Sequence, residues 1–330
     1  GAILTGEADA LLGGPPVAAM IVQNTNPASV CPEQEKVIAG LSRDDLFLCV
    51  HEQFMTETAR LADVVLPATT FVEHDDVYRG GGQQHVLFGP KLIDAPGECR
   101  ENHAVVAELA CRLGAEHRGF GMTPREHVAW MLERSGYGPL ETLEAEGWLD
   151  VQPPFREAHY LDGFAHPDGR FHFRVDWTKV PLGNAGPMGP WAELPSLPDH
   201  WEAIETPTAA EPFRLVTAPA RSFLNSTFNE TVSSRTREGR PTVLMNPADA
   251  ADLGLADGEL VRLFNARGAV RLHLKLFEGL KRGVLVSEGL WPNEAFVDGR
   301  GINVLTGADP VAPYGGAAFH DNRVGVERGA

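Results

Sequence analysis

Residues 45–67, DLFLCVHEQFMTETARLADVVLP, decide the fold of the first part of the chain. The run 45–51 is apolar and predicts a strand, and TETARLA (56–62) predicts a short helix with Thr56 as its N-cap. DVVLP (63–67) predicts a further strand that its final proline stops. The stretch therefore indicates a strand–helix–strand unit.

The neighbouring segments repeat this alternation. VAAMIVQ (17–23) predicts a strand and PEQEKVIAGL (32–41) a helix. Near-continuous apolar strands separated by helices are typical of a parallel sheet covered on both faces, so we expect a Rossmann-like α/β domain over residues 1–115. The segment 96–114 predicts an amphipathic helix that ends at Gly114 and has one apolar face, formed by Val105, Val106, Leu109 and Leu113.

The pattern changes at Phe213 to short β-type runs with tight turns. PADAADLGLADGE (247–259) predicts a short helix followed by an Asp-Gly turn, and FNARGAVRLHL predicts a hairpin. We therefore expect a small β-barrel with a helix on it over residues 212–330. Residues 116–211 are irregular, with a predicted helix at 123–136 and an inter-domain connection at 194–212.

Composition excludes some classes of function. The net charge of -17 argues against a nucleic-acid partner, which requires a concentrated basic surface. The cysteines form no CxxC pair, which argues against a zinc or iron–sulfur site within the chain and fits a reducing, cytoplasmic compartment; they are Cys31, Cys49, Cys99 and Cys111.

The N-terminal sequence lacks an initiator methionine and a basic leader ahead of an apolar stretch. No secretory signal is expected, and no apolar run approaches the ~20 residues that span a bilayer. We expect no membrane insertion, and we expect the sequence to begin inside a longer protein.

Polar residues follow the first two predicted strands. Asn24 and Asn26-Pro27 follow the first strand, and His51 and Glu52 end the second. Loops after parallel strands bind ligands, and a carboxylate there suits guanine, which offers paired N–H donors. The alternative is that Asn26-Pro27 is only a turn and Glu52 a solvated loop residue.

An acidic cluster, Glu73-His74-Asp75-Asp76, lies in a short loop after the third strand. It is either a cation site or a solvated acidic loop. Gly80-Gly81-Gly82 lacks the Lys-Ser/Thr continuation of a phosphate loop.

The second half contains polar loops. TAPARSFLNSTFNE (217–230) is dense in Ser, Thr and Asn and offers many uncharged hydrogen bonds to a heterocycle, with Arg221 as a phosphate contact. GRGINVLTGADP (299–310) and AFHDNRVGVE (318–327) are further polar passages.

In order, these segments resemble the dimethyl sulfoxide reductase family of molybdopterin oxidoreductases. The resemblance rests on TNP, TETARLADVVLPATTFVEHDD and PGECRENHAVVAELACRLG in the first half. In the second half it rests on VLMNPADAADLGLADGELVRLFNARGAV, INVLTGADP and AFHDNRVGVE. It covers most of residues 17–115 and 212–328.

The resemblance implies a bis(molybdopterin guanine dinucleotide) cofactor, with Mo or W, held between Rossmann-like domains and a six-stranded barrel of double-psi type. The positions that match the family's cofactor contacts are Asn24, Asn26, Pro27, His51, Glu52, His74, Asn102, Thr217, Arg221, Asn225, Ser226, Thr227, Asn303 and His320. Two positions depart from the family: Asn102 stands where many relatives have Asp, and the pterin loop has Phe223 and Asn225 where many relatives have His.

The resemblance also implies that the metal's protein ligand and a [4Fe-4S] cluster lie in an N-terminal part that this sequence does not contain. The catalytic residues are accordingly unknown, no protein ligand to the metal is expected here, and the chain alone is expected to be inactive. Formate dehydrogenase or nitrate reductase activity is the favoured expectation. The N-terminal part and an electron-transfer subunit are the expected partners.

Two alternatives remain open from the sequence. The first is a homologue that kept the fold and lost the cofactor, as in a subunit of respiratory complex I. The retained polar loops argue against it, because an empty site tends to fill with apolar residues. The second is an unrelated nucleotide-binding module.

Overall fold

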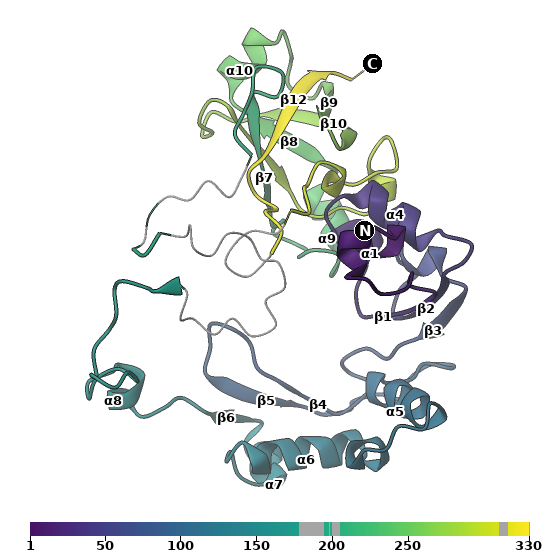
Figure 1. Cartoon of the computed structure of the whole chain (residues 1–330), viewed down its shortest axis with the longest axis vertical. Coiled ribbons are helices and arrows are strands. Elements are labelled where there is room, and N and C mark those ends of the chain that lie inside the picture. Colours follow the sequence, from purple (N-terminus) through teal and green to yellow (C-terminus); the bar gives the residue numbers. More distant parts are fainter. Residues whose placement is uncertain (178–194, 198, 200–204, 310–315, 330) are drawn as a thin grey trace.

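The computed structural model describes residues 1–177, 195–197, 199, 205–309 and 316–329. Its first layer is a three-stranded parallel sheet. Its order is β1 (Ala19–Gln23), β2 (Phe47–Glu52) and β3 (Val64–Pro67). One face is covered by short helices, which pack on Val22, Leu48 and Val50 (Figure 1). These helices are α1 (Ala2–Thr5), α3 (Pro27–Val30) and α4 (Gln34–Leu41). The short helix α2 (Ala8–Leu11) follows α1 and contains no buried residue.

The second layer is a smaller antiparallel sheet with helices, drawn at the bottom of Figure 1. Its strands are β4 (Asp76–Tyr78), β5 (His85–Gly89) and β6 (Trp148–Asp150). Its core joins Val86 to apolar residues of two helices, among them Leu132 and Leu143. The helices of this part are α5 (Asn102–Arg112), α6 (Pro124–Arg134), α7 (Leu140–Glu146) and α8 (Phe155–Ala158), with a 3-10 turn at Arg118–Gly121. A further 3-10 turn, Ala59–Leu61, lies between β2 and β3 and packs in the core of the parallel sheet.

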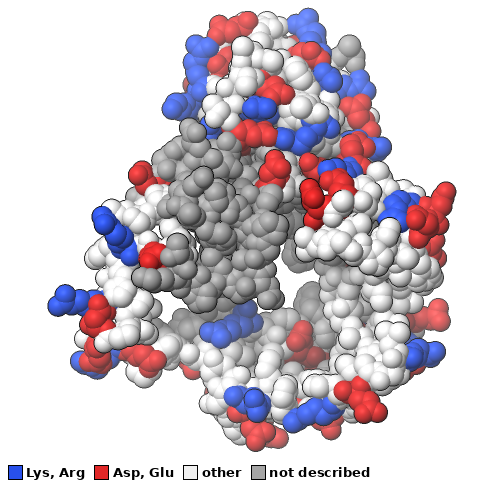
Figure 2. Space-filling model, in the orientation of Figure 1, with Lys and Arg blue, Asp and Glu red and all other residues white. Residues whose placement is uncertain are grey.

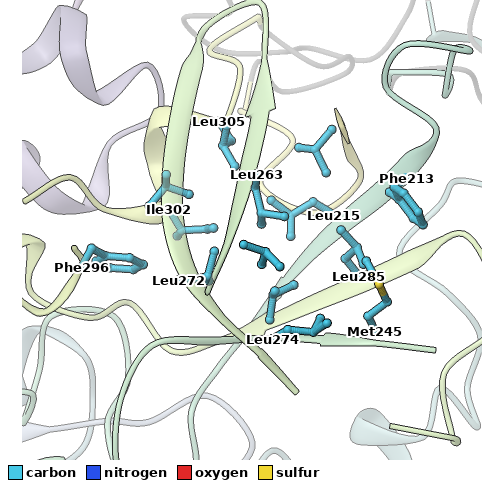
Figure 3. Close-up of a cluster of buried hydrophobic side chains, with 14 of the residues drawn as sticks. Phe213, Leu215, Met245, Leu263, Leu272, Leu274, Leu285, Phe296, Ile302 and Leu305 are labelled. Carbon is cyan, nitrogen blue, oxygen red and sulfur yellow. The ribbon is translucent and has the colours of Figure 1, made fainter. Parts of the chain in front are cut away.

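The third part is a closed barrel of six strands in the order β10-β8-β11-β7-β12-β9. Its strands are β7 (Phe213–Ala218), β8 (Thr242–Met245), β9 (Leu260–Asn265), β10 (Gly268–Leu276), β11 (Val284–Glu288) and β12 (Asn322–Arg328). Alternate residues fill the interior, as Figure 3 shows for Leu215, Leu263 and Leu285. The helices α9 (Val232–Glu238) and α10 (Pro247–Asp252) and 3-10 turns at Asn293–Ala295 and Ile302–Val304 complete it.

The predicted fold class, a parallel α/β sheet followed by a six-stranded barrel, is confirmed. Most predicted elements are present with shorter bounds.

Figure 2 shows acidic and basic residues interspersed over the surface of the barrel. Within the described residues, no helix has the length and apolar character needed to cross a membrane.

Three local predictions were wrong. The helix predicted at 96–114 begins only at Asn102, because Gly97 has a φ of +55° and the preceding segment follows β3 instead. Its predicted apolar face is only partly buried: Val106 and Leu113 are exposed, Val105 and Leu109 are half-buried, and Ala107 is the buried residue of α5. The predicted helix at 56–62 is a single 3-10 turn, although Thr56 does accept a hydrogen bond from the Ala59 N–H.

The parallel sheet also differs from its prediction. Helices cover one of its faces, whereas Ile21 and Phe47 on the other face are exposed. Of the predicted connection at 194–212, residues 194, 198 and 200–204 lie outside the described residues, as does Pro310.

Candidate functional site

A cavity of about 400 Å³ lies where the barrel loops meet the C-terminus of α3. Among the described residues, its wall carries no acidic side chain and no Lys or Arg, so these residues offer neutral hydrogen-bonding groups between apolar surfaces. The lining residues are Val30, Thr217, Ala218, Pro219, Leu224, Asn225, Gly289, Leu290, Ile302, Asn303, Phe319 and His320. Such a wall suits a flat, polar heterocycle.

Neighbouring strands of the barrel bring the polar groups of this cavity together. Thr217 at the end of β7 donates its hydroxyl hydrogen to the Phe319 carbonyl at 3.0 Å, and its Oγ1 lies 3.5 Å from Nδ1 of His320. β7 and β12 are antiparallel partners, which is why residues about a hundred positions apart meet here. Asn225 has a left-handed φ of 49°, which Asn tolerates better than most residues.

Gly289 shapes the same wall. Its φ is +81°, and a Cβ at this position would lie 2.7 Å from the Phe223 ring and 2.8 Å from Cβ of Ala220. Only glycine therefore allows the loop after β7 to lie this close to the end of β11.

Asn303 connects the cavity to the parallel sheet. The side chain is buried, and its amide donates to the carbonyls of Ser29 and Val30 at 2.9 and 3.1 Å. Its Oδ1 accepts from the Thr306 hydroxyl at 3.0 Å. Asn303 thus fixes the barrel against α3.

Asn26 is buried at the carboxyl end of β1, just before α3. Its Oδ1 accepts hydrogen bonds from the N–H and hydroxyl of Thr58, and its Nδ2 donates to Glu57 at 2.7 Å. These bonds join the loops after β1 and β2. The amide therefore positions the rim of the site.

His51 is fully buried, and both ring nitrogens are in use. Nδ1 lies 2.9 Å from the Gln23 amide nitrogen and Nε2 lies 3.1 Å from the Arg100 carbonyl. A neutral ring with its proton on Nε2 satisfies both contacts, because the Gln23 amide then donates to Nδ1. His51 thus anchors the segment that leads into α5.

A group of carboxylates surrounds the carboxyl end of the sheet. Burial raises the pKa of Glu52, against the opposing effects of the Gln53 N–H and His51. Burial also raises the pKa of Glu230, and the negative charges of Glu57 and Glu52 add to the rise. Glu52 therefore lies near the barrel loop that contains Glu230, at the junction of sheet and barrel.

His74 and Asn102 lie elsewhere. Both line a second cavity of about 500 Å³ between β4, α5 and α6. Nδ1 of His74 is 2.9 Å from the Thr69 hydroxyl. The structure therefore separates these two residues from the cavity below the barrel.

The acidic cluster near His74 is held largely by backbone contacts. Glu73, Asp75 and Asp76 accept hydrogen bonds from the N–H groups of Thr70, Lys91 and Val77, respectively. Within the described ranges, no group of three or more His, Cys, Asp or Glu residues is arranged to hold a metal ion.

Comparisons with known proteins agree with this architecture. Residues 10–112 match the family model described as Molybdopterin oxidoreductase, and residues 213–323 match the one described as Molydopterin dinucleotide binding domain. The chain is 31% identical over 95% of its length to the probable oxidoreductase YoaE of Bacillus subtilis (strain 168). It is 29% identical over 81% of its length to the dimethyl sulfoxide/trimethylamine N-oxide reductase of Rhodobacter capsulatus. The chain belongs to the dimethyl sulfoxide reductase family of molybdopterin oxidoreductases.

A solved structure of similar fold is acetylene hydratase from Pelobacter acetylenicus, with a TM-score of 0.77 and 22% identity over 99% of this chain. The chain covers 46% of that structure, 45% of YoaE and 35% of the Rhodobacter reductase. It thus spans less than half the length of these relatives.

The residues of the cavity fit part of the family's cofactor. Thr217 and Asn225 supply hydrogen-bonding groups, and the space beside Gly289 exists only because that residue has no side chain. Neutral donors are suitable because they leave no unpaired buried charge beside a large polar ligand.

The structure thus divides the residues implied by the resemblance. Four of them line the cavity: Thr217, Asn225, Asn303 and His320. A second group lies at the carboxyl ends of β1 and β2 and comprises Asn24, Asn26, Pro27, His51 and Glu52. Arg221, Ser226 and Thr227 belong to the loop after β7 without lining the cavity, and all these contacts to a cofactor stay predictions.

Several residues that shape the site were not predicted. Gln34 and Asn293 join sheet and barrel, and Gly289 and Leu290 line the cavity. The sequence did contain an indication that Gln34 makes a buried polar contact, because it is a polar residue on the otherwise apolar face of α4. Asn293 and Leu290 carry no such signal, because the contacts that give them a role come from distant parts of the chain.

Proposed function

We propose that this chain forms the cofactor-binding half of a molybdenum or tungsten oxidoreductase that carries molybdopterin guanine dinucleotide. The single observation that supports this most is the neutral cavity between the barrel and α3, in a chain whose two matched segments lie on either side of it. When bound, the metal and its dithiolenes supply the redox chemistry.

The protein's own contribution is binding and orientation. Thr217 and Asn225 would bind polar edges of the cofactor, and His320 beside Thr217 adds a ring nitrogen at the same wall. Asn303 would hold the two halves of the site at a fixed distance, since its amide bonds the carbonyls of α3 across the junction of barrel and sheet. Asn26 would fix the loops after β1 and β2 relative to one another, since its amide bonds Glu57. The metal's protein ligand and a [4Fe-4S] cluster are proposed to lie in the remaining part of the enzyme.

The substrate class is a separate proposal. The sequence favoured formate dehydrogenase or nitrate reductase activity. The relatives that we compared include reductases of dimethyl sulfoxide, trimethylamine N-oxide and biotin sulfoxide. These relatives favour an S- or N-oxide as the oxidising substrate, and formate or nitrate remains the second candidate.

The cofactor proposal is tested on the whole protein as it occurs in cells. Metal analysis and guanosine monophosphate released by acid hydrolysis are expected to show Mo or W together with the nucleotide. A properly folded protein that contains neither would overturn the proposal and favour a homologue without cofactor. Nucleotide without metal would favour an unrelated nucleotide-binding module.

Matched variants test the cavity itself. Thr217→Val and Asn225→Gly remove polar groups from its wall while keeping the strand and the left-handed backbone, respectively. We expect both to lower the retained nucleotide by about tenfold, the effect of one or two lost hydrogen bonds. Thr242→Val, in β8 and away from the cavity, is the control and is expected to leave the nucleotide content unchanged.

A further inference from the structure

The backbone at Asp321 has an unusual conformation beside the cavity. Its φ is +91°, a positive value that residues with a Cβ rarely adopt. Asp321 directly follows His320, which lines the cavity, and directly precedes Asn322, the first residue of β12. Asp tolerates a positive φ better than most residues, yet such a backbone persists only where neighbouring contacts hold it. The contacts of this turn therefore decide where His320 lies.

Asp321 is held against β7 by two contacts. Its N–H donates to the Leu215 carbonyl at 2.8 Å, and its Oδ1 forms an ion pair with the guanidinium of Arg214. Oδ1 is buried and has no hydrogen-bond partner among the described residues, so the charge of Arg214 is what compensates for its burial. The Asp321 side chain is only 19% exposed, and a partly buried pair of this kind is screened less than a surface pair.

The residues on either side of His320 are fixed as well. The Asn322 amide donates to the carbonyls of Ala318 and Phe319, both at 3.1 Å. The Thr217 hydroxyl also donates to the Phe319 carbonyl, at 3.0 Å. The turn is thus held before and after His320, and the φ of the residue that follows sets how His320 is turned relative to β12.

His320 offers the cavity one hydrogen-bond acceptor. Its Nδ1 lies 3.5 Å from Oγ1 of Thr217, whose hydroxyl hydrogen is already donated to the Phe319 carbonyl. Oγ1 therefore presents a lone pair to the ring, and a neutral ring with its proton on Nδ1 satisfies the contact. Nε2 is then an acceptor, and within the described residues it has no hydrogen-bond partner.

We propose that Asp321 is a positioning residue, which through its ion pair with Arg214 holds His320 where Nε2 accepts a hydrogen bond from an N–H group of the cofactor's ring system. Neither Asp321 nor Arg214 lines the cavity, so both act through His320. This inference rests on the proposed function, because it takes the occupant of the cavity to be that cofactor. It goes beyond it by assigning a role to an ion pair outside the cavity wall.

Nucleotide retention in the whole, cofactor-containing protein tests the inference. Asp321→Asn removes the charge and keeps a residue that tolerates a positive φ, and Arg214→Gln removes the charge of the partner. Arg214→Lys is the conservative variant, which keeps the charge. Glu327→Gln is the matched control, because it removes the ion pair between Glu327 and Arg262 on the same strand, away from the cavity.

The rate of nucleotide loss is measured as guanosine monophosphate that acid hydrolysis releases from protein re-isolated at intervals. We expect Asp321→Asn and Arg214→Gln to lose nucleotide about three- to tenfold faster than the parent, as the loss of one partly buried ion pair implies. Arg214→Lys is expected to stay within about twofold of the parent, because it retains the charge of the pair. Glu327→Gln is expected to equal the parent.

A double-mutant cycle with His320→Ala shows whether Asp321 acts through His320. Asp321→Asn is expected to have no further effect on nucleotide loss once the imidazole is absent, because both changes remove the same contact. An undiminished effect in that background would overturn the inference and assign Asp321 to the general stability of the barrel. Parent-like retention in both Asp321→Asn and Arg214→Gln would also overturn it.

Modification of His320 by diethyl pyrocarbonate, read by peptide-resolved mass spectrometry on the same samples, separates this inference from the proposed function. A parent without nucleotide contradicts the proposed function alone if Asp321→Asn still speeds modification of His320, because the ring is then no longer held beside Thr217. A parent that retains nucleotide contradicts the positioning role alone if Asp321→Asn changes neither retention nor modification. A parent without nucleotide and an unchanged rate of modification contradict both.

Discussion

The side chains of Asn26 and His51 stabilise the segments at the carboxyl ends of β1 and β2 by buried hydrogen bonds. Asn26 and His51 each use their polar atoms on protein partners, and both are almost completely buried. A buried polar group costs free energy when its partner is removed, so these residues stabilise one arrangement of the loops. Their effect on a cofactor would be exerted through that arrangement.

Asn26→Ala is expected to lower the free energy of unfolding by about 1–3 kcal/mol, because the N–H and hydroxyl of Thr58 lose their acceptor in a buried place. Asn24→Gly is the control, since Asn24 is exposed and has a φ of 52° that glycine adopts without strain. Urea denaturation measures both. Equal losses in the two variants would show that the Asn26 amide contributes nothing specific.

Glu230 gives a prediction for pH. Burial and the charges of Glu57 and Glu52 raise its pKa above the ordinary value of 4.5. The native state therefore favours the protonated carboxyl more than the unfolded state does. The loss in the free energy of unfolding is absent below pH 4.5, develops as the pH rises from there through the raised pKa of Glu230, and is complete above that pKa.

Glu230→Gln removes this cost. We expect the variant to be more stable than the parent at pH 7, by less than about 1 kcal/mol because the site is partly solvated. The difference should vanish near pH 4. The exposed residue Glu278 provides the control Glu278→Gln, and thermal unfolding from pH 4 to 8 is the measurement. A parent that is more stable than Glu230→Gln at pH 7 would contradict the prediction.

At the scale of elements, β11 illustrates how a strand end shapes a cavity wall. It begins after Gly283, with a φ of +77°, and ends before Gly289, with a φ of +81°. Both glycines adopt a backbone that other residues avoid. Only Gly289 is also enclosed by neighbouring side chains, those of Phe223 and Ala220.

The two glycines therefore form a matched pair. Gly283→Ala is expected to cost about 1–2 kcal/mol from backbone strain alone, because nothing lies within 4 Å of its Cβ. Gly289→Ala is expected to cost a further 1–3 kcal/mol or so, because its Cβ overlaps the Phe223 ring. Guanidinium unfolding measures both. Equal costs would mean that the loop after β7 moves away without penalty.

At the scale of the whole molecule, a buried network joins the sheet to the barrel. The Gln34 amide donates to the Ala28 carbonyl and to Oδ1 of Asn293, both at 2.9 Å, and its oxygen accepts from the Gly301 N–H. Glu57 accepts from the Asn293 N–H at 2.8 Å and also holds Asn26. The two halves of the site therefore share one network.

Gln34→Ala is expected to lower the free energy of unfolding by about 1–3 kcal/mol and to separate the unfolding of sheet and barrel, because Asn293 and Gly301 lose a buried partner. Differential scanning calorimetry is the measurement. Gln53→Ala is the control, because Gln53 is exposed and its side chain makes one hydrogen bond, to the Thr69 carbonyl. We expect this variant to lose about 0.5 kcal/mol or less in the free energy of unfolding. A single, unshifted transition in Gln34→Ala would contradict the coupling.

The pattern of apolar and polar residues predicted most strands of the parallel sheet and the barrel. Each of these strands either alternates apolar with polar residues, as β10 does, or is apolar over most of its length, as β2 is. The pattern failed for the first residues of the 96–114 segment, where Arg100 follows β3 and accepts from His51. It also failed for part of the apolar face of α5, where Val106 and Leu113 are exposed, because coverage by other elements decides burial. Thr217 and His320 were both predicted, yet their contact depends on the pairing of β7 with β12.

The sequence by itself determined the two kinds of fold, the barrel's strands and the polar residues at the strand ends, since these depend on local patterns of side-chain polarity. Only the tertiary structure decided which polar residues share a cavity, which ones spend their hydrogen bonds on the protein, and which face of the sheet stays open. The physical reason is that burial and hydrogen-bond partners come from segments distant in the chain, as Asn303 with Ser29 and Gln34 with Gly301 demonstrate.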